Sequence, residues 1–310
     1  MRKIISVVGL VLMILCIGVL PSKGQNSSKK SFHKGFHLLT IDRDEAMHYL
    51  TEAIEYDSTN AEAYYYRGLL QYKQENFPEA IKDFELALFH NPDFHLVHLY
   101  KGFTFRSMDS VEMAINEFDK YLKKNPKDSS AYAYILRGKW RMQSGDLTGA
   151  EEDFDLAIAL KPLEEKYYYY RFITLYDKGN YKMALKEIEK VLDLNPDFYG
   201  YYYYKGNVLL NLGQYKNAID IYNISLSYND YNADAYFQRG QAFEKLNDYA
   251  EAIESYNMAI MMSPNEGVYY SKRGNNKFSH GDKSGACEDW EYANTLGYYE
   301  DYEKMKVLCN

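Results

Sequence analysis

A repeat of 34 residues constrains the fold of this chain more than any other feature of its sequence. Three columns of residues return at this interval, apart from two additional residues, Ser129 and Ser130, in one turn. A period of this length predicts a stacked array of small helical units, because one such unit cannot bury its apolar face alone. The columns are glycine (Gly68, Gly102, Gly138, Gly206, Gly240, Gly274), alanine (Ala80, Ala114, Ala150, Ala184, Ala218, Ala252, Ala286) and proline (Pro92, Pro126, Pro162, Pro196, Pro264).

The sequence pattern within each unit predicts two helices joined by a tight turn. In residues 233–266, apolar positions between Tyr236 and Phe243 recur at helical spacing, and a second helical pattern contains Tyr256. Asp248 is a suitable N-cap for the second helix. Pro264 ends that helix, because the residue before a proline is disfavoured in the helical region. The sequence therefore predicts an all-α fold.

At these residues the chain resembles the tetratricopeptide repeat family. The resemblance implies a right-handed superhelical solenoid of antiparallel helix pairs. It covers seven full copies over 61–300, preceded by a polar segment and a degenerate copy over 25–60 and followed by a capping helix over 301–310. The polar residues Gln25–Ser31 are expected to be loose. The full copies are 61–94, 95–128, 131–164, 165–198, 199–232, 233–266 and 267–300.

The small residues of the repeat have a steric interpretation. Gly240 and Ala252 are expected near the middle of their two helices, where larger side chains would hold the helices apart. Phe172 replaces the glycine of the copy 165–198, so this pair is expected to be splayed or shifted. Asp230 replaces proline in the next copy, and its turn is expected to form through side-chain hydrogen bonds.

Residues 1–24 are typical of a secretory signal peptide. Two basic residues precede an apolar run that ends at Leu20, and small residues stand where a signal peptidase would cleave, before Gln25. Cleavage there implies an exported protein of the periplasm or cell envelope, or a secreted one, with no stable membrane span in the mature chain. Two alternatives stay open. The run is nearly long enough to remain as a membrane anchor, and Cys16 is a potential lipidation site.

Charge and motifs argue against several classes of function. The formal net charge is −8 and no basic stripe is present, so nucleic acid is not an expected partner. No phosphate loop, GxSxG, HExxH or paired cysteine spacing occurs, so no catalysis, cofactor or metal is expected. The pairs His33/His37 and His95/His98 have helical spacings that could contact one metal, but neither pair has an evident third ligand.

Every full copy carries Lys or Arg immediately before the glycine column, and in five copies an acid follows sixteen residues later. This pattern has two interpretations: a ladder of cations for an acidic ligand, or ion pairs between the two helices of each repeat. The regular position of the acids favours the ion pairs. The predicted pairs are Arg67–Asp83, Arg137–Asp153, Arg171–Glu187 and Arg273–Asp289.

Tyrosine is the outlier of the composition, with 34 residues, many of them in runs within first helices. Two of these runs consist of four consecutive tyrosines, 167–170 and 201–204. In these runs we expect Tyr168 and Tyr202 to pack in the core, and Tyr169 and Tyr203 to face a groove. The resemblance implies that the first helices line a concave groove, and positions spaced three, four and three apart share one face of a helix. The candidate groove residues are Tyr65, Tyr72, Leu99, Phe103, Tyr132, Ile135, Tyr169, Tyr176, Tyr203, Asn207 and Phe237. The same face also includes Leu210, Gln241 and Glu244.

The two cysteines left after signal removal predict a disulfide. An even count suits an oxidising compartment. Cys287 lies early in the last second helix, and Cys309 ends the capping helix, which can fold back over that repeat. The alternative is a pair of buried thiols.

The resemblance and the tyrosine-rich face together predict a non-catalytic scaffold of the cell envelope that binds a protein or peptide. Family members that bind chaperone tails carry lysine where Tyr65 and Leu99 stand, so a chaperone C-terminus is not the expected partner. Two alternatives remain. One is a glycan-binding or uptake accessory protein, because tyrosine rings can stack on sugars. The other is a spacer subunit of an envelope enzyme or assembly complex.

Overall fold

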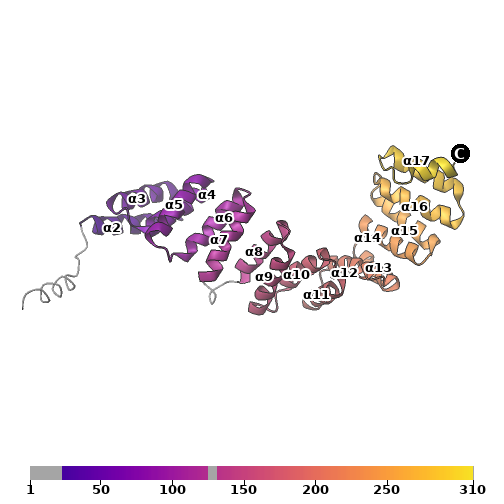
Figure 1. Cartoon of the computed structure of the whole chain (residues 1–310), viewed down its shortest axis with the longest axis horizontal. Coiled ribbons are helices and arrows are strands. Elements are labelled where there is room, and N and C mark those ends of the chain that lie inside the picture. Colours follow the sequence, from indigo (N-terminus) through magenta and orange to yellow (C-terminus); the bar gives the residue numbers. More distant parts are fainter. Residues whose placement is uncertain (1–22, 125–130, 310) are drawn as a thin grey trace, which may run out of the picture. The chain divides into compact units, whose positions relative to one another are not determined.

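The computed structural model describes residues 23–124 and 131–309, which form helices joined by turns, with no strand among them (Figure 1). The proposed signal peptide lies outside these residues except for its last two, and the inserted Ser129 and Ser130 also lie outside them. None of the described helices is long and apolar enough to cross a membrane. The chain divides into two compact units, one ending at Ser129 and one beginning at Ser130.

The first unit contains three described helix pairs, in which consecutive helices pack against each other. The first pair is the degenerate copy, and the other two are full repeats, so the predicted all-α array is confirmed here. The pairs are α2 (Lys23–Leu38) with α3 (Arg43–Tyr56), α4 (Ala61–Lys73) with α5 (Phe77–His90), and α6 (His95–Ser107) with α7 (Val111–Lys124).

The second unit contains five helix pairs and a short last helix, α18 (Tyr302–Leu308), which is the predicted capping helix. Each second helix also packs against the first helix of the next pair, which makes the unit a stacked array. The pairs are α8 (Ala131–Gln143) with α9 (Leu147–Leu160), α10 (Glu165–Asp177) with α11 (Tyr181–Leu194), α12 (Gly200–Asn211) with α13 (Tyr215–Tyr228), α14 (Ala233–Lys245) with α15 (Tyr249–Met262), and α16 (Gly267–His280) with α17 (Lys283–Thr295).

Helix α2 corrects the expectation of a loose segment at Gln25–Ser31, because these residues are helical. Ser28 is buried and donates from Oγ to the carbonyl oxygen of Ala53 at 2.7 Å. It also accepts a hydrogen bond from Asn60 Nδ2 at 3.1 Å. The segment has few apolar residues, and small serine side chains allow its backbone to pack closely on α3.

The turn between the two helices of each full repeat contains one residue in the left-handed region. Four of these residues are glycine, which reaches this conformation without steric cost. The other three residues have a side chain, so this conformation costs them free energy, because the Cβ lies too close to the following carbonyl oxygen. This column was not recognised from the sequence. Its members are Gly145 (φ 86°), Gly179 (72°), Gly213 (73°) and Gly281 (98°), with Glu75 (63°), Asp109 (57°) and Asn247 (59°).

The glycine column makes room for an aromatic ring on the second helix of the same repeat. A Cβ built on Gly240 would lie 2.7 Å from Cε1 of Tyr256, which is closer than ordinary van der Waals contact. The same contact recurs wherever the glycine is present. The expected steric role is therefore confirmed, but the crowding group is a ring sixteen residues away. The other facing pairs are Gly68–Phe84, Gly102–Phe118, Gly138–Phe154, Gly206–Tyr222 and Gly274–Trp290.

The repeat that lacks this glycine exchanges the two side chains instead. Phe172 on α10 and Ile188 on α11 are both buried and belong to one core cluster. The large ring stands on the first helix and the smaller side chain stands where the other repeats have an aromatic residue. The large side chain is therefore moved from the second helix to the first, and the expectation that this pair is splayed or shifted stays a prediction.

Side-chain caps begin several of the helices, and the predicted Asp248 cap of α15 is confirmed. Asp42 accepts hydrogen bonds from the backbone N–H groups of Asp44 and Glu45 at the start of α3. In the turn without proline, Asn229 Oδ1 accepts from the N–H of Tyr231 at 3.2 Å. Asn232 caps α14 in the same way, so this side-chain-bonded turn is confirmed.

Candidate functional site

The cation column is occupied by structural ion pairs. The shortest contacts are 2.8 Å for Arg67–Asp83, 2.7 Å for Arg171–Glu187 and 2.6 Å for Arg273–Asp289, and Arg137 also pairs with Asp153. These predictions are confirmed. Several of the cations also reach back to the preceding second helix, which links neighbouring repeats. These additional pairs are Lys101–Glu85 (3.0 Å), Lys205–Glu189 (2.9 Å) and Arg171–Asp155.

Arg239 differs from the rest of the column because no carboxylate of the described residues forms an ion pair with it. Its Nε donates to Ser255 Oγ at 3.2 Å and its Nη1 donates to Asn223 Oδ1 at 2.8 Å. Burial of the guanidinium lowers the pKa of Arg239. The side chain is thus held by neutral groups within its own pair and the preceding one.

The histidine pair on α6 is used for packing. His98 is buried, and its Nδ1 lies 2.7 Å from Glu117 Oε2. Burial by itself would raise the pKa of Glu117, but hydrogen bonds from His98 and Lys120 and the nearby charge of Lys101 lower it to about 2. In the described part of the chain, no group of three or more His, Cys, Asp or Glu side chains is arranged to hold a metal.

Two members of the predicted binding face are buried and do not lie on an open surface. Tyr65 is 4 % exposed and packs against Phe94 and Tyr100, and Ile135 is 5 % exposed in the core of the second unit. This corrects their assignment as groove residues. In the same first unit Tyr72, Leu99 and Phe103 are half-buried. Tyr72 and Phe103 each contact a ring on the second helix of their own repeat, Phe77 and Phe118 respectively.

Tyr169 and Tyr203 are half-buried, and each contacts core rings. Tyr169 lies 5.2 Å from Tyr201 and 5.7 Å from Tyr204, measured between ring centroids. Burial raises the pKa of both Tyr169 and Tyr203. Of their two predicted inner partners, Tyr168 is buried as expected and Tyr202 is only half-buried. Tyr132, in contrast, is 60 % exposed.

The second unit contains a cleft of about 440 Å³ that includes four residues of the predicted face, Tyr176, Asn207, Leu210 and Gln241. We call it the Gln241 cleft. Its walls carry amide and phenol groups, with Lys245 as the one formal charge. The other lining residues are Asn211, Tyr215 and Gln238.

Hydrogen bonds hold one wall of the Gln241 cleft in place. Asn211 Nδ2 donates to Tyr176 Oη at 3.0 Å, and Tyr222 Oη donates to Asn207 Oδ1 at 2.7 Å. Burial raises the pKa of Tyr176, so its phenol is neutral at physiological pH. Gln238 and Gln241 on α14 are half-exposed, and no hydrogen bond to another described residue occupies their amides. The cleft thus contains both polar groups that are held by hydrogen bonds and two glutamine amides that are available to a ligand.

Two further clefts adjoin the first through shared residues. The Phe237 cleft, of about 740 Å³, shares Gln238 and contains the predicted Phe237 with Tyr231 and Tyr269. The Asn276 cleft, of about 330 Å³, shares Lys245. Its other lining residues are Glu244, Asn247, Tyr249, Asn275, Asn276 and Ser279.

Sequence reasoning missed most of the polar lining of these clefts. Tyr215 and Tyr249 are one repeat apart, as are Asn211 and Lys245, so the lining does follow the 34-residue period. The residue type changes between Asn211 and Lys245, so this column was not recognised. Tyr215 and Tyr249 do form an aromatic column, but they begin the second helices α13 and α15, whereas the predicted face was read only on first helices.

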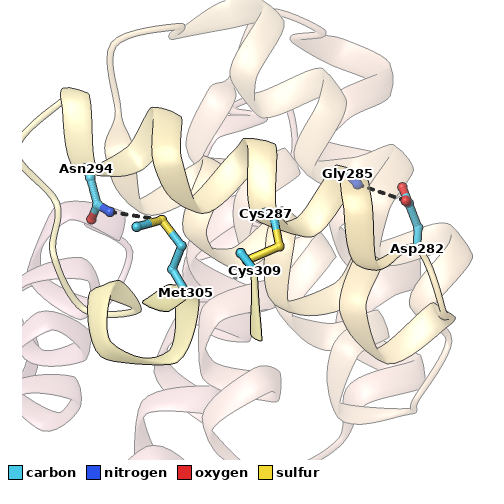
Figure 2. Close-up of a disulfide and its surroundings, with 6 residues drawn as sticks. All are labelled: Asp282, Gly285, Cys287, Asn294, Met305 and Cys309. Atoms are coloured by element: carbon cyan, nitrogen blue, oxygen red, sulfur yellow. Dashed lines mark hydrogen bonds between the residues drawn. A yellow bond between two sulfur atoms is a disulfide. The ribbon is translucent and has the colours of Figure 1, made fainter. Parts of the chain in front are cut away.

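The predicted disulfide joins Cys287 on α17 to Cys309 after α18, with their Cα atoms 5.7 Å apart (Figure 2). It closes α18 onto the last repeat. Asn294 Nδ2 also donates to Met305 Sδ at 3.4 Å (Figure 2). On the same segment, Asp301 accepts a hydrogen bond from the hydroxyl of Ser271.

The chain contains tetratricopeptide repeats. Residues 61–94 and 233–266 match one family model described as a tetratricopeptide repeat, and residues 171–230 match another of the same description. The helix pairs, their glycine–aromatic contacts and their stacking agree with this family.

Solved structures with a similar fold include MamA, from residue 41 to its end, of Desulfovibrio magneticus RS-1. It has a TM-score of 0.53 and 24% identity, with 55% of this chain and 97% of that chain covered. The C-terminal part of a TPR repeat-containing protein from Cytophaga hutchinsonii has a TM-score of 0.60 and 18% identity, covering 74% and 93%. These similarities show the fold alone.

Among curated proteins, a DnaJ homolog subfamily C member 7 homolog of Dictyostelium discoideum is 25% identical over 160 residues. The match covers 47% of this chain and 30% of that protein. The mitochondrial import receptor subunit TOM70 of Rattus norvegicus is 28% identical over 117 residues, covering 36% and 19%. This chain therefore spans less than a third of either relative.

Proposed function

We propose that this protein is a non-catalytic scaffold that binds an extended peptide segment of a partner protein in the Gln241 cleft. The observation that carries the proposal is the open pair of amides at Gln238 and Gln241, opposite the fixed Asn211–Tyr176 wall. An amide side chain both donates and accepts, which matches the alternating N–H and C=O groups of a peptide backbone.

The lining of the cleft favours a neutral or acidic segment. Lys245 supplies the only formal charge among the lining residues of the Gln241 cleft. Tyr176 and Tyr215 add ring area at a small cost in side-chain entropy, as tyrosine does in other recognition surfaces. Among the relatives, one is named an import receptor subunit and one a DnaJ homologue, and a role in handling polypeptides fits both names.

The test uses twelve-residue peptides selected from a random library against the oxidised protein. The double variant Gln238→Ala/Gln241→Ala should bind a selected peptide about tenfold more weakly, since two hydrogen bonds of about 0.5–1.5 kcal/mol each are lost. Asn217→Ala is the matched control, because this exposed amide on α13 lies outside the three clefts. Unchanged affinity in the double variant would refute the proposed site.

We also propose that the protein is exported and acts in the cell envelope. The basic start, the apolar run and the small residues before Gln25 support this location. The Cys287–Cys309 pair is consistent with an oxidising compartment. Mass spectrometry of the mature N-terminus should find it at or near Gln25, and an intact Met1 in the soluble cytosolic fraction would contradict the proposal.

An exposed aromatic stack favours glycan binding as a second candidate function. The ring centroids of Tyr199 and Tyr228 are 3.5 Å apart, and the angle between the two ring planes is 8°. Tyr231, which is near Tyr228 in the sequence, is 76 % exposed. Exposed ring faces can stack on sugars. Retention on immobilised polysaccharide that is lost in Tyr228→Ala and kept in Gln238→Ala/Gln241→Ala would support this alternative over peptide binding.

A further inference from the structure

The Asn276 cleft contains a polar atom that the folded chain leaves without a partner. Asn276 on α16 is only 1 % exposed, yet it lines this cleft. Its Oδ1 is buried and has no hydrogen-bond partner among the described residues. Buried polar atoms are paired in the large majority of cases, so an unpaired one calls for an explanation.

The orientation of the Asn276 amide is determined by its surroundings. Nδ2 donates to the carbonyl oxygen of Lys272 at 2.8 Å and to Glu244 Oε2 at 3.0 Å. Both partners are acceptors, so the group between them must be the NH₂ group. The unpartnered atom is therefore the carbonyl oxygen, and it requires a donor.

The second partner of Asn276 is itself held in place. Glu244 Oε2 also accepts a hydrogen bond from Tyr256 Oη at 2.9 Å. Burial and the neighbouring Glu244 raise the pKa of Tyr256, so the phenol keeps its proton. This chain of bonds, from Tyr256 through Glu244 to Asn276, fixes the acceptor before any ligand arrives.

Packing does not demand an asparagine at this position. The equivalent residues one and two repeats earlier are Ala242 and Val208, both fully buried. Where the column carries a hydroxyl, at Thr104 and Thr174, that hydroxyl donates to a carbonyl of its own helix. Of the copies described, only the last has a buried polar atom left over in this column.

We propose that Asn276 Oδ1 accepts a backbone N–H of the same extended peptide that occupies the Gln241 cleft. This inference rests on the proposed peptide binding. The donor is a neutral N–H, because Lys245 and Glu244 both line the cleft and their opposite formal charges give it no net charge that would select a charged group. Lys245 lines both clefts, so one segment can run from the first into the second.

The experiment is a coupling measurement with a selected twelve-residue peptide. Each backbone amide of the peptide is N-methylated in turn, and affinities are measured for the wild type and Asn276→Ala. One methylation should weaken binding to the wild type about tenfold, by loss of one buried hydrogen bond, and should have less than about a twofold effect on the variant. The equivalent position in the preceding repeat is an alanine, Ala242, so the variant is expected to fold.

Asn276→Thr is a second variant, because Thr104 and Thr174 occupy this column with their hydroxyls bonded to their own helices. It should give the same loss of coupling. If the peptide binds and Gln238→Ala/Gln241→Ala weakens it, but no methylation couples to position 276, the inference about Asn276 is overturned and the proposed function stands. If Gln238→Ala/Gln241→Ala has no effect on any selected peptide, the proposed function fails, and this inference fails with it.

Discussion

Gly138 on α8 lies directly against the ring of Phe154 on α9, so that a Cβ at position 138 would be 2.6 Å from Cε1 of the ring. The ring is fully buried. Gly138→Ala should therefore destabilise the protein by about 1–3 kcal/mol, the usual cost of overpacking a core. Chemical denaturation measures this directly.

The fourth full repeat suggests the control for this prediction. There Phe172 faces Ile188, so the smaller side chain stands on the second helix. In Gly138→Ala/Phe154→Ile the added methyl should fit the space that the ring leaves, and the double variant should lose less stability than the sum of the two single variants. If the stability losses of the two single variants simply add in the double variant, the glycine does not serve to make space for the ring.

Glu75→Gly should stabilise the protein. Glu75 has φ of 63° in a turn where four other repeats have glycine, and its side chain is exposed. Relief of the left-handed backbone is worth roughly 1–2 kcal/mol, and the greater freedom of glycine in the unfolded chain offsets part of it. A net gain of about 0.5–1 kcal/mol is expected from thermal or urea unfolding. Gly179→Ala, at the equivalent turn, should lose about 1 kcal/mol, and the prediction fails if both changes have the same sign.

Ser255→Asp should complete the ion-pair column. Arg239 Nε already contacts Ser255 Oγ, and the equivalent position carries an acid at Asp83, Asp153 and Asp289. A charge-assisted hydrogen bond to the desolvated guanidinium should add about 1–2 kcal/mol to the free energy of unfolding. Ser255→Asn, of similar size but neutral, is the control. An equal change in both variants would show that charge is not the cause.

Glu117 should make stability depend on pH in the acidic range. Its pKa in the folded protein is about 2, below its value of about 4.3 in an unfolded chain. The unfolded state binds the proton more readily, so the stabilisation is present above about pH 4.3 and is lost as the pH falls towards 2. The difference in unfolding free energy between wild type and Glu117→Gln should shrink over that range. A difference that stays constant with pH would contradict the assignment.

Removal of the disulfide should loosen the last repeat first. Cys287→Ser/Cys309→Ser should lose about 2–4 kcal/mol, and amide protons of α18 should exchange faster than those of α16. Helix α18 has no buried residue, so it is held mainly by the disulfide, by the contacts of Asp301 and Met305, and by Lys304, which contacts Asn275 and lies over the rings of Phe278 and Trp290. Reductant should have the same effect on the wild type and none on the double variant. Free-thiol labelling of both cysteines in the native protein would contradict the pairing.

The 34-residue period was sufficient to predict the helix pairs, the Asp248 cap and the ion pairs. Each of these depends on residues at a constant spacing within one or two repeats, so that local geometry alone brings them together. Asp248 capping α15 and Arg67 pairing with Asp83 are examples. The exchange of Phe172 with Ile188 was missed because the sequence shows a lost glycine but not the ring for which glycine makes space.

The open surface was decided only by the tertiary structure. Tyr65 and Tyr176 both belong to the tyrosine-rich face in the sequence, yet Tyr65 is buried against Phe94 and Tyr176 lines a cleft. Helical spacing defines the side of a helix, but it does not say how far the next helix covers that side. The amide of Asn276 shows the same limit. Its unpartnered oxygen follows from Glu244 and Lys272 together, one of which belongs to the preceding repeat.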